Sequence, residues 1–393
     1  MHKKLLSLTI NTWKLLLKLI FVIPLFSAIA ATAQTKPPLK IGAFLSSTGA
    51  ASYLGSGELK TLQLYVDLIN KEGGVDGRKI ELYAYDDETD AARANTIVKR
   101  LINNDQVHAI IGGSTTGTTM SAVPLVERAG ISMLSLAGGS VIVEPIKPFV
   151  FKMNHTDMMA IGKIFDHMVS QGTKNIGIIA GTDAYGRAAL EAAKKLAPEK
   201  GIAILIDESF NPKDTDMTAQ LTKLRQFTGI QAILDLGFGE PAVMVARSYK
   251  QLGIAVPHYG THALASDRFV KLAGAAADGM IMTNGAILVS DQLPGNDPQR
   301  QVLQNYVKNY SEKFGEVPSY FGGNAYDALM LIKNAVQKIG SVDPKEIRNA
   351  IEKHDAYIGV TGAFRMSPTD HVGVTAQSFK MVRVQDGKWV LIK

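Results

Sequence analysis

Short apolar segments alternate along the chain with segments of helical periodicity. Val107–Ile111 and Ile131–Ser135 are mostly apolar, which is typical of strands buried in a parallel sheet. In Ser56–Asn70, by contrast, apolar residues recur at intervals of three and four, which predicts an amphipathic helix. The alternation of strand and helix predicts an α/β fold in which each parallel sheet is flanked by helices.

The alternation occurs in two blocks, followed by a mainly helical part. In the first block we predict strands at Leu39–Leu45, Lys79–Tyr85, Val107–Ile111 and Ile131–Ser135, and helices at Ser56–Asn70, Ala91–Ile102 and from Thr118 to Glu127. In the second block we predict strands at Asn175–Ala180, Ile202–Glu208, Ala232–Leu236, His258–Thr261 and Gly279–Thr283, and helices at Met158–Ser170, Arg187–Leu196, Thr215–Phe227 and Ala242–Leu252. Helices at Pro298–Phe314, Tyr320–Ile339 and Pro344–Lys353 follow, then a hairpin of Phe379–Val384 and Trp389–Ile392. Two similar blocks in 393 residues predict two similar lobes.

Glycine-rich turns follow two of the predicted strands. Gly112–Gly117 comes after Val107–Ile111, and Ala137–Ser140 comes after Ile131–Ser135. Open α/β sheets bind ligands at the carboxyl ends of their strands, and free N–H groups at a helix start attract anions. The two turns therefore predict a pocket for a small anion, most simply a carboxylate. The same residue types are also typical of plain βα turns and helix N-caps, so this alternative stays open.

The first 33 residues have the composition of a secretory signal peptide. Lysines come first, Leu15–Ile29 is mostly apolar, and Ala31–Ala33 forms an A-x-A cleavage site. Lys18 and Pro24 interrupt the apolar stretch and make it short for a membrane span, so a retained anchor is the weaker alternative. We therefore expect an exported, soluble mature chain.

The net charge of +6 overstates how basic the mature chain is. Residues 1–33 contain four of the 42 basic side chains and none of the 36 acidic ones. The remaining 38 basic and 36 acidic side chains give a net charge of +2. Because no basic run or aromatic-basic stripe is left, we do not expect a nucleic-acid partner.

Common catalytic motifs are missing from the sequence. It has no cysteine, no G-x-x-x-x-G-K-[ST], no G-x-S-x-G and no H-E-x-x-H, and its eight histidines are scattered. We therefore expect no enzymatic activity, no cofactor and no metal site.

Several short motifs, in their order and spacing, resemble the periplasmic substrate-binding proteins of ABC importers, in the leucine/isoleucine/valine-binding branch with the type I fold. They are Leu39–Gly42 leading to Ser47–Gly49, Ile69–Gly77, Tyr85–Asp87, Tyr185-Gly186 and Asn324–Ala328. The resemblance covers essentially the whole mature chain. It implies two α/β lobes that close over a small ligand, joined by a hinge of three crossings.

The resemblance also implies where the lobes begin and end. The three crossings would lie near Asn154-His155, Thr283-Asn284 and Gly359–Thr361. Lobe 1 would then comprise residues 37–155 and 285–360, and lobe 2 residues 156–284 and 361–393, after the signal peptide at 1–33.

The family holds a ligand carboxylate with groups from the two glycine turns. Carried over to this sequence, the resemblance implies that Thr116, Gly138 and Ser140 bind the carboxylate, with a plain N-cap or turn residue as the alternative for Thr116. It also implies three aromatic side chains around the ligand. They are Tyr53 after the first strand, Tyr185 of the Tyr-Gly pair and Phe238 as the nearest match to a second aromatic of lobe 2.

The chain departs from the family where amino-acid binders carry an acid for the ligand's ammonium group. His262 stands at that position, and a histidine cannot neutralise an ammonium. Asp157 could substitute in part, because this branch often has an acid at the first crossing, although Asp157 also fits a helix N-cap before Met158. An amino acid and an ammonium-free aromatic or organic acid therefore stay open as ligands.

The resemblance implies a periplasmic solute-binding protein that captures a small carboxylate and delivers it to an ABC transporter permease. The alternative is an exported ligand-sensing module that is not coupled to transport. A monomer is the default expectation.

Overall fold

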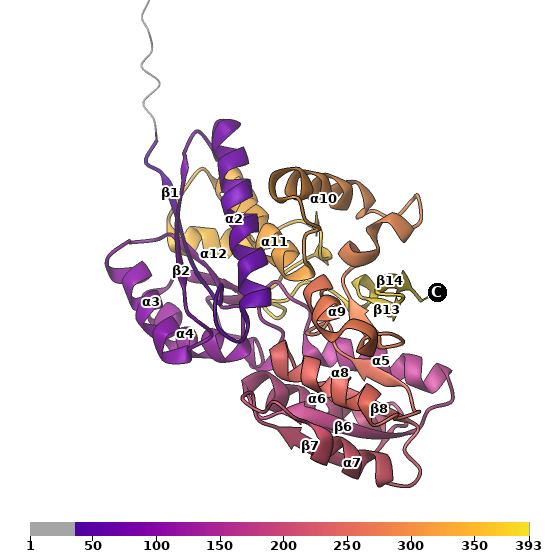
Figure 1. The fold of residues 1–393 in the computed structure, drawn as a ribbon. Helices are drawn as coiled ribbons and strands as arrows, with labels where there is room; N and C mark the ends of the chain where they lie inside the picture. Colours follow the sequence, from indigo (N-terminus) through magenta and orange to yellow (C-terminus); the bar gives the residue numbers. More distant parts are fainter. Residues whose placement is uncertain (1–35, 393) are drawn as a thin grey trace, which may run out of the picture. The chain divides into compact units, whose positions relative to one another are not determined.

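Two β-sheets organise residues 36–392, the part of the chain that this computed structural model describes (Figure 1). The predicted signal peptide, residues 1–33, and the last residue, Lys393, lie outside the described residues.

The first sheet has the strand order β2-β1-β3-β4-β5, and all of its neighbouring strands are parallel. Its strands are β1 (Leu39–Leu45), β2 (Ile80–Asp86), β3 (Ala109–Gly112), β4 (Ser132–Ser135) and β5 (Val150–Lys152). Helix α11 (Tyr320–Ile339) contacts α2 (Ser52–Lys71) and α12 (Pro344–Glu352), and α3 (Ala91–Asn103) contacts α4 (Thr116–Ala129). Helix α11 comes from the third, mainly helical part of the chain.

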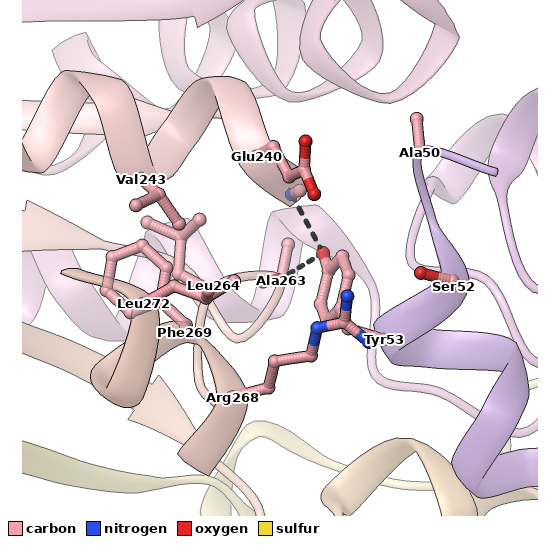
Figure 2. Close-up of a pocket in the computed structure, with 11 residues that line it drawn as sticks. Ala50, Ser52, Tyr53, Glu240, Val243, Ala263, Leu264, Arg268, Phe269 and Leu272 are labelled. Atoms are coloured by element: carbon pink, nitrogen blue, oxygen red, sulfur yellow. Dashed lines mark hydrogen bonds between the residues drawn. The ribbon is translucent and has the colours of Figure 1, made fainter. Parts of the chain in front are cut away.

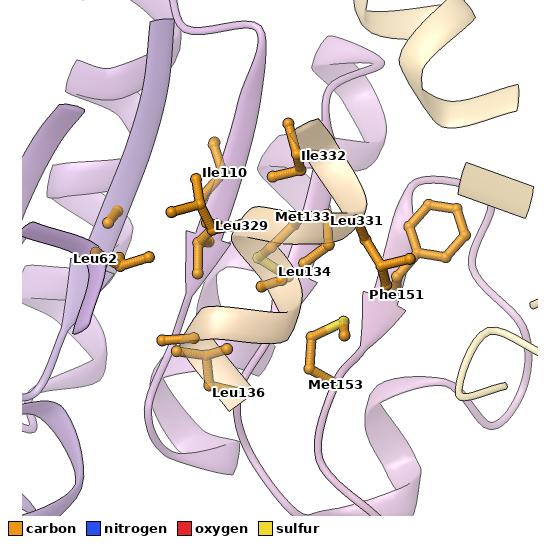
Figure 3. Packing of buried hydrophobic residues seen from close by; sticks show 14 of the residues in the cluster. Leu62, Ile110, Met133, Leu134, Leu136, Phe151, Met153, Leu329, Leu331 and Ile332 are labelled. Atoms are coloured by element: carbon orange, nitrogen blue, oxygen red, sulfur yellow. The ribbon is translucent and has the colours of Figure 1, made fainter. Parts of the chain in front are cut away.

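The core of this half lies between α11 and the sheet. Figure 3 shows Leu329 and Ile332 of α11 beside Ile110 and Met133 of the strands, and all four side chains are buried. Burying an aliphatic side chain of this size contributes about 1.5–3 kcal/mol. The layer therefore holds the carboxyl ends of β3 and β4, from which the glycine turns leave, in fixed positions.

The second sheet has the order β14-β13-β10-β9-β8-β6-β7. Strands β6 (Asn175–Gly181), β7 (Ala203–Phe210), β8 (Ala232–Leu236), β9 (His258–Gly260) and β10 (Ile281–Asn284) are parallel, and β13 (Lys380–Gln385) and β14 (Lys388–Leu391) are an antiparallel hairpin at its edge. Helices α5 (Asp157–Ser170) and α6 (Ala184–Glu199) contact each other, as do α7 (Thr218–Gln226), α8 (Gly239–Gln251) and α9 (Asp267–Ala273) in sequence. Asp386 and Gly387 both have positive φ, as the tight hairpin turn requires.

The remaining elements are α10 (Arg300–Phe314) and a two-stranded pair of β11 (Tyr357–Ile358) and β12 (Ala363–Phe364). The apolar side chains of Phe364, Val374 and Phe379 join the core cluster of the first sheet, whereas the second sheet has clusters of its own. These three residues fall in the range predicted for lobe 2, although their side chains pack in the core of the first sheet. The exact lobe boundaries stay a prediction.

The structure confirms the predicted α/β fold and every strand and helix predicted above, with ends that differ by a few residues. Strand β5, with three residues, strands β11 and β12, with two each, and helix α9, with seven, were not predicted. All four are too short to show a periodic pattern.

Candidate functional site

The two glycine turns lie side by side, because β3 and β4 are adjacent parallel strands. The Gly139 amide donates to the Thr116 hydroxyl oxygen over 3.3 Å, which joins one turn to the other. Helix α4 begins at Thr116, earlier than the predicted Thr118, and Thr115 is its N-cap, with a hydroxyl that accepts the Thr118 amide. The N-cap interpretation of Thr116 is therefore wrong. Since its oxygen accepts from Gly139, the hydroxyl hydrogen of Thr116 is left to donate elsewhere.

Backbone amides at the same point are available to a ligand. Thr116 and Gly117 are the first two residues of α4, where amides have no acceptor within the helix. Within residues 36–392, no hydrogen bond from the Gly138 amide is present either. The helix dipole of α4 adds partial positive charge. The two turns can thus donate several hydrogen bonds to one anion.

A cavity that is partly open to solvent lies in front of these turns. Loops of both sheets line it. The lining residues are Tyr53, Leu54, Ser114, Thr115, Thr116, Gly138, Asn154, Tyr185, Phe238, His262, Ala263 and Phe321. We call this cavity the turn pocket. It combines hydroxyls and free amides on one side with aromatic rings on the other.

Tyr53, in the first turn of α2, reaches across to the second sheet's loops. Its hydroxyl donates to the Ala263 carbonyl over 2.9 Å and accepts the Gly239 amide over 3.1 Å. Figure 2 shows this hydroxyl between Ala263 and the start of α8, with Arg268 beside the ring. Tyr53 lines both the cavity of Figure 2 and the turn pocket, so its ring forms the wall between them.

Tyr185 and Phe238 form the wall that comes from the second sheet. Their rings are 6.0 Å apart and nearly perpendicular, and the Tyr185 hydroxyl is hydrogen-bonded to the Thr261 hydroxyl over 2.7 Å. Gly138 faces Tyr185 and His262 at close range, since a Cβ there would lie 2.9 Å from His262 Nε2 and 3.3 Å from Tyr185. A side chain at position 138 would therefore collide with this wall.

His262 is buried in the lining and carries no charge at neutral pH. Burial, with a smaller effect of Lys152, lowers the pKa of His262 to about 3. Its Nδ1 has no hydrogen-bond partner among the described residues. The His262 ring thus offers a neutral polar edge rather than a cation or an anion.

A buried lysine stands behind this region. Lys152 Nζ donates to the carbonyl oxygens of Asn154 and His155, over 2.5 and 2.6 Å. Burial lowers the pKa of Lys152 to about 7, although Asp157 opposes the shift. The His155 ring is held between the Tyr320 and Ser378 hydroxyls, over 2.7 Å each.

The model of the family described as "Periplasmic binding protein" matches residues 38–388. The chain belongs to this family. It is of the type I fold, in the leucine/isoleucine/valine-binding branch. Among curated proteins it is similar to the leucine-, isoleucine-, valine-, threonine- and alanine-binding protein of Pseudomonas aeruginosa, at 24% identity over 84% of this chain and 87% of that one.

Solved structures of the family are similar to this periplasmic binding protein over nearly all of its length. An extracellular ligand-binding receptor from Rhodopseudomonas palustris HaA2 matches with a TM-score of 0.85 and 26% identity, covering 91% of this chain and 100% of that chain. The branched-chain amino acid transporter substrate-binding protein LivJ of Streptococcus pneumoniae, in complex with isoleucine, matches with a TM-score of 0.79 and 24% identity, covering 91% and 99%. These relatives are solute-binding proteins, and they support a two-lobed arrangement.

Six of the eight predicted site residues of this periplasmic binding protein line the turn pocket, and two do not. Ser140, the last residue of the second turn, lies outside the lining, and its amide donates to Asp157 Oδ1 over 3.1 Å. Asp157 is buried and also accepts the Met158 amide, while its Oδ2 has no partner among the described residues. Thr156, whose hydroxyl accepts the Met159 amide, is the N-cap of α5, so the N-cap interpretation of Asp157 is wrong.

Two residues at the turn pocket of this periplasmic binding protein, one in the lining and one behind it, were not predicted from the sequence. Phe321, in the first turn of α11, lines it, but no pattern links that helix to the glycine turns. Glu58, on α2, is fully buried and hydrogen-bonded to Ser114. The burial of Glu58 could have been predicted from the sequence, because Glu58 falls on the apolar face of α2 with Leu54 and Leu62, at intervals of four.

Residues 36–392 contain neither a candidate membrane span nor a candidate metal site. No helix there has the length and apolar character to span a membrane, and no group of three or more His, Asp or Glu side chains is arranged to hold a metal ion.

Proposed function

We propose that this chain is a periplasmic solute-binding protein that captures a small carboxylate in the turn pocket and delivers it to the permease of an ABC importer. The observation that carries the proposal is that Thr116 and Gly138, from two turns joined by a hydrogen bond, line one pocket together with aromatic side chains. The family supports the binding role, since its curated relatives are amino-acid-binding proteins by name. In this role the protein releases its ligand unchanged and is not an enzyme.

The carboxylate would lie against the two turns. The Thr116 hydroxyl and the Gly138 amide would donate to its oxygens, and the dipole of α4 would favour its charge. The apolar body of the ligand would extend toward Tyr53 and Phe238. Burying such a body gains about 25 cal/mol per Å² of apolar surface.

The lining favours a carboxylate without an α-ammonium group. In the described part of the chain, no lining residue of the turn pocket is acidic, and His262 is neutral. Asp157, the one acid among the predicted site residues, is not in the lining and already accepts two amides. An unpaired buried ammonium would weaken binding by several kcal/mol, or about a thousandfold. We therefore propose an aromatic or branched aliphatic acid in preference to an amino acid.

Matched ligand pairs test this proposal by calorimetry. Leucine is compared with 4-methylpentanoate, and phenylalanine with 3-phenylpropanoate, because the members of each pair differ only in the α-ammonium group. We expect the ammonium-free member to bind at least tenfold more tightly. Tighter binding of the amino acids would make the protein an amino-acid binder like its named relatives. No binding of any carboxylate would refute the proposed role of the turns.

A further inference from the structure

Two buried carboxyl groups lie directly behind the first glycine turn, linked to it by a chain of hydrogen bonds. Glu58 and Asp87 are both fully buried. The Ser46 hydroxyl donates to Asp87 Oδ1 over 2.6 Å, and the Ser46 amide donates to the Ser114 hydroxyl oxygen over 2.9 Å. The Ser114 hydroxyl is in turn hydrogen-bonded to Glu58 Oε2. Since Ser114 also lines the turn pocket, the chain runs from Asp87 to the ligand site.

The surroundings of Glu58 oppose a negative charge. Its other oxygen, Oε1, has no hydrogen-bond partner in the described residues. Asp87, from the loop after β2, and Tyr53, one turn earlier on α2, are the titratable groups that interact with it electrostatically. Within residues 36–392, neither Glu58 nor Asp87 forms an ion pair with a lysine, arginine or histidine. Burial first, then the charge of Asp87, raises the pKa of Glu58 to about 8.

The protonation state of Glu58 determines whether the Ser114 hydroxyl can donate a hydrogen bond to a ligand. A serine hydroxyl has one hydrogen to donate and two lone pairs that accept. The Ser46 amide occupies one lone pair. If Glu58 is ionised, the hydrogen of Ser114 must go to Glu58, and Ser114 turns only a lone pair toward the pocket. If Glu58 is protonated, it donates to the second lone pair, and the hydrogen of Ser114 is free to point into the pocket.

We propose that Glu58 is a proton switch for anion binding, in which a carboxylate binds at Ser114 only when Glu58 is protonated. Above the pH at which Glu58 ionises, each bound carboxylate would take up one proton from water, which forms the O–H bond of Glu58. The proposal rests on the proposed function, because it requires a carboxylate in the turn pocket. An ionised Glu58 would oppose binding twice, by removing a donor and by repelling the ligand's charge.

The first arm of the test needs no ligand. The infrared spectrum of the wild type at pH 7 is compared with that of Glu58→Gln. We expect a protonated-carboxyl band in the wild type that the variant lacks and that disappears as the pH is raised through 8. A Glu58 that is already ionised at pH 6 would overturn the proposal.

The second arm uses 4-methylpentanoate and 3-phenylpropanoate as probes in calorimetry, at pH 6 and pH 9.5, in buffers with different heats of ionisation. For the wild type we expect uptake of nearly one proton at pH 9.5 and none at pH 6, with affinity that falls up to tenfold per pH unit above 8. Glu58→Gln, whose amide can still donate to Ser114, should lose this proton uptake and the tenfold slope, whereas any contribution of Lys152, whose pKa is lowered to about 7, is common to both proteins. Asp235→Asn is the matched control, since Asp235 is also a buried acid but lies outside the pocket lining, and it should behave as the wild type.

The outcomes separate the two proposals. Failure of both probes to bind at pH 6 would refute the proposed function, whatever the infrared result. Equal affinity of the wild type at pH 6 and 9.5, or a pH slope that survives in Glu58→Gln, would overturn the proton switch alone.

Discussion

The Thr116 hydroxyl has two roles, one structural and one in the pocket. Its oxygen accepts the Gly139 amide, which fastens the second turn to the first, and its hydrogen is left for the pocket. The neighbouring Thr115 caps the helix, so Thr116 is not needed for that purpose. At the scale of single residues, the candidate site depends on Thr115, and not Thr116, being the N-cap of α4.

Thr116→Val should abolish carboxylate binding while the protein stays folded. The change removes a donor to the ligand and leaves the Gly139 amide unpaired, which should lower the free energy of unfolding by only about 1–2 kcal/mol. Calorimetry and urea denaturation measure the two effects. Thr119→Val, one turn along the same helix, removes a buried hydroxyl outside the pocket lining and should leave the affinity intact. Unchanged affinity of Thr116→Val would remove Thr116 from the site.

The raised pKa of Glu58 also predicts how the free energy of unfolding depends on pH. Its pKa is raised by burial from 4.5 to about 8 in the folded protein. The folded state therefore binds more protons than the unfolded state between these values, and the stabilising contribution is lost as the pH rises through this window. Relative to Glu58→Gln, the wild type should lose up to about 1.4 kcal/mol of unfolding free energy per pH unit between pH 5 and 8.

Denaturant unfolding of both proteins across this range measures the difference. Lys152, whose pKa is lowered to about 7, acts in the opposite direction above pH 7, but it is common to both proteins and cancels. A difference that does not vary with pH would mean that Glu58 titrates normally.

At the scale of elements, α2 does more than cover the first sheet. Its first turn carries Tyr53, whose hydroxyl contacts the start of α8 and the loop after β9. These contacts join elements of the two sheets on the side where the turn pocket lies. They can form only when the two sets of loops meet, so they would stabilise the conformation that encloses a ligand.

Tyr53→Phe should weaken ligand binding about tenfold without changing the fold. Each lost hydrogen bond is worth roughly 0.5–1.5 kcal/mol, and both would be lost from the enclosing conformation alone. Calorimetry gives the affinity, and thermal unfolding without ligand gives the stability. Tyr83→Phe, at an exposed hydroxyl that contacts Glu81, is the matched control and should change neither. A wild-type affinity for Tyr53→Phe would show that these bonds do not contribute to binding.

At the scale of the whole molecule, the hydrophobic core is divided. Leu134 of β4 belongs to the cluster of the first sheet, and Leu234 of β8 belongs to a cluster of the second. Hydrophobic cores that do not merge predict units that can lose structure separately. The proposed lobes would be such units.

Hydrogen exchange of two variants tests the division. Leu234→Ala should cost about 2–5 kcal/mol and lower the protection of amides in β6 and β8, with little effect on β1 and β3. Leu134→Ala should have the opposite pattern. If either variant lowers protection equally in both sheets, the chain unfolds as one cooperative unit and the lobe division is wrong as an energetic description.

Much of the fold could be predicted because it depends on patterns among residues that are close together in the sequence. Val107–Ile111 and Ala232–Leu236 are apolar runs of strand length between helical segments, and such runs need no distant information to be recognised. The meeting of the two glycine turns could also be anticipated, since successive parallel strands often pair. Short elements such as β5 could not, because three residues carry no period.

The candidate site was only partly predictable, because hydrogen bonds to distant residues decide which side chains face the pocket. Ser140 was predicted to bind the ligand, yet its amide donates to Asp157 and it lies outside the lining. Phe321 comes from a helix more than 180 residues after the first glycine turn, and sequence spacing says nothing of that contact.

The amino-acid sequence by itself determined the alternation of strands and helices, the glycine turns and the residue types placed on them, since these depend on local periodicity and backbone preference. Tertiary structure alone decided that Thr115 caps α4 while Thr116 faces the pocket, that no acid lines it, and that Glu58 stands buried behind Ser114. The reason is physical: burial and long-range hydrogen bonding set the protonation state and the free donors of a side chain, and both exist only once distant segments have packed together.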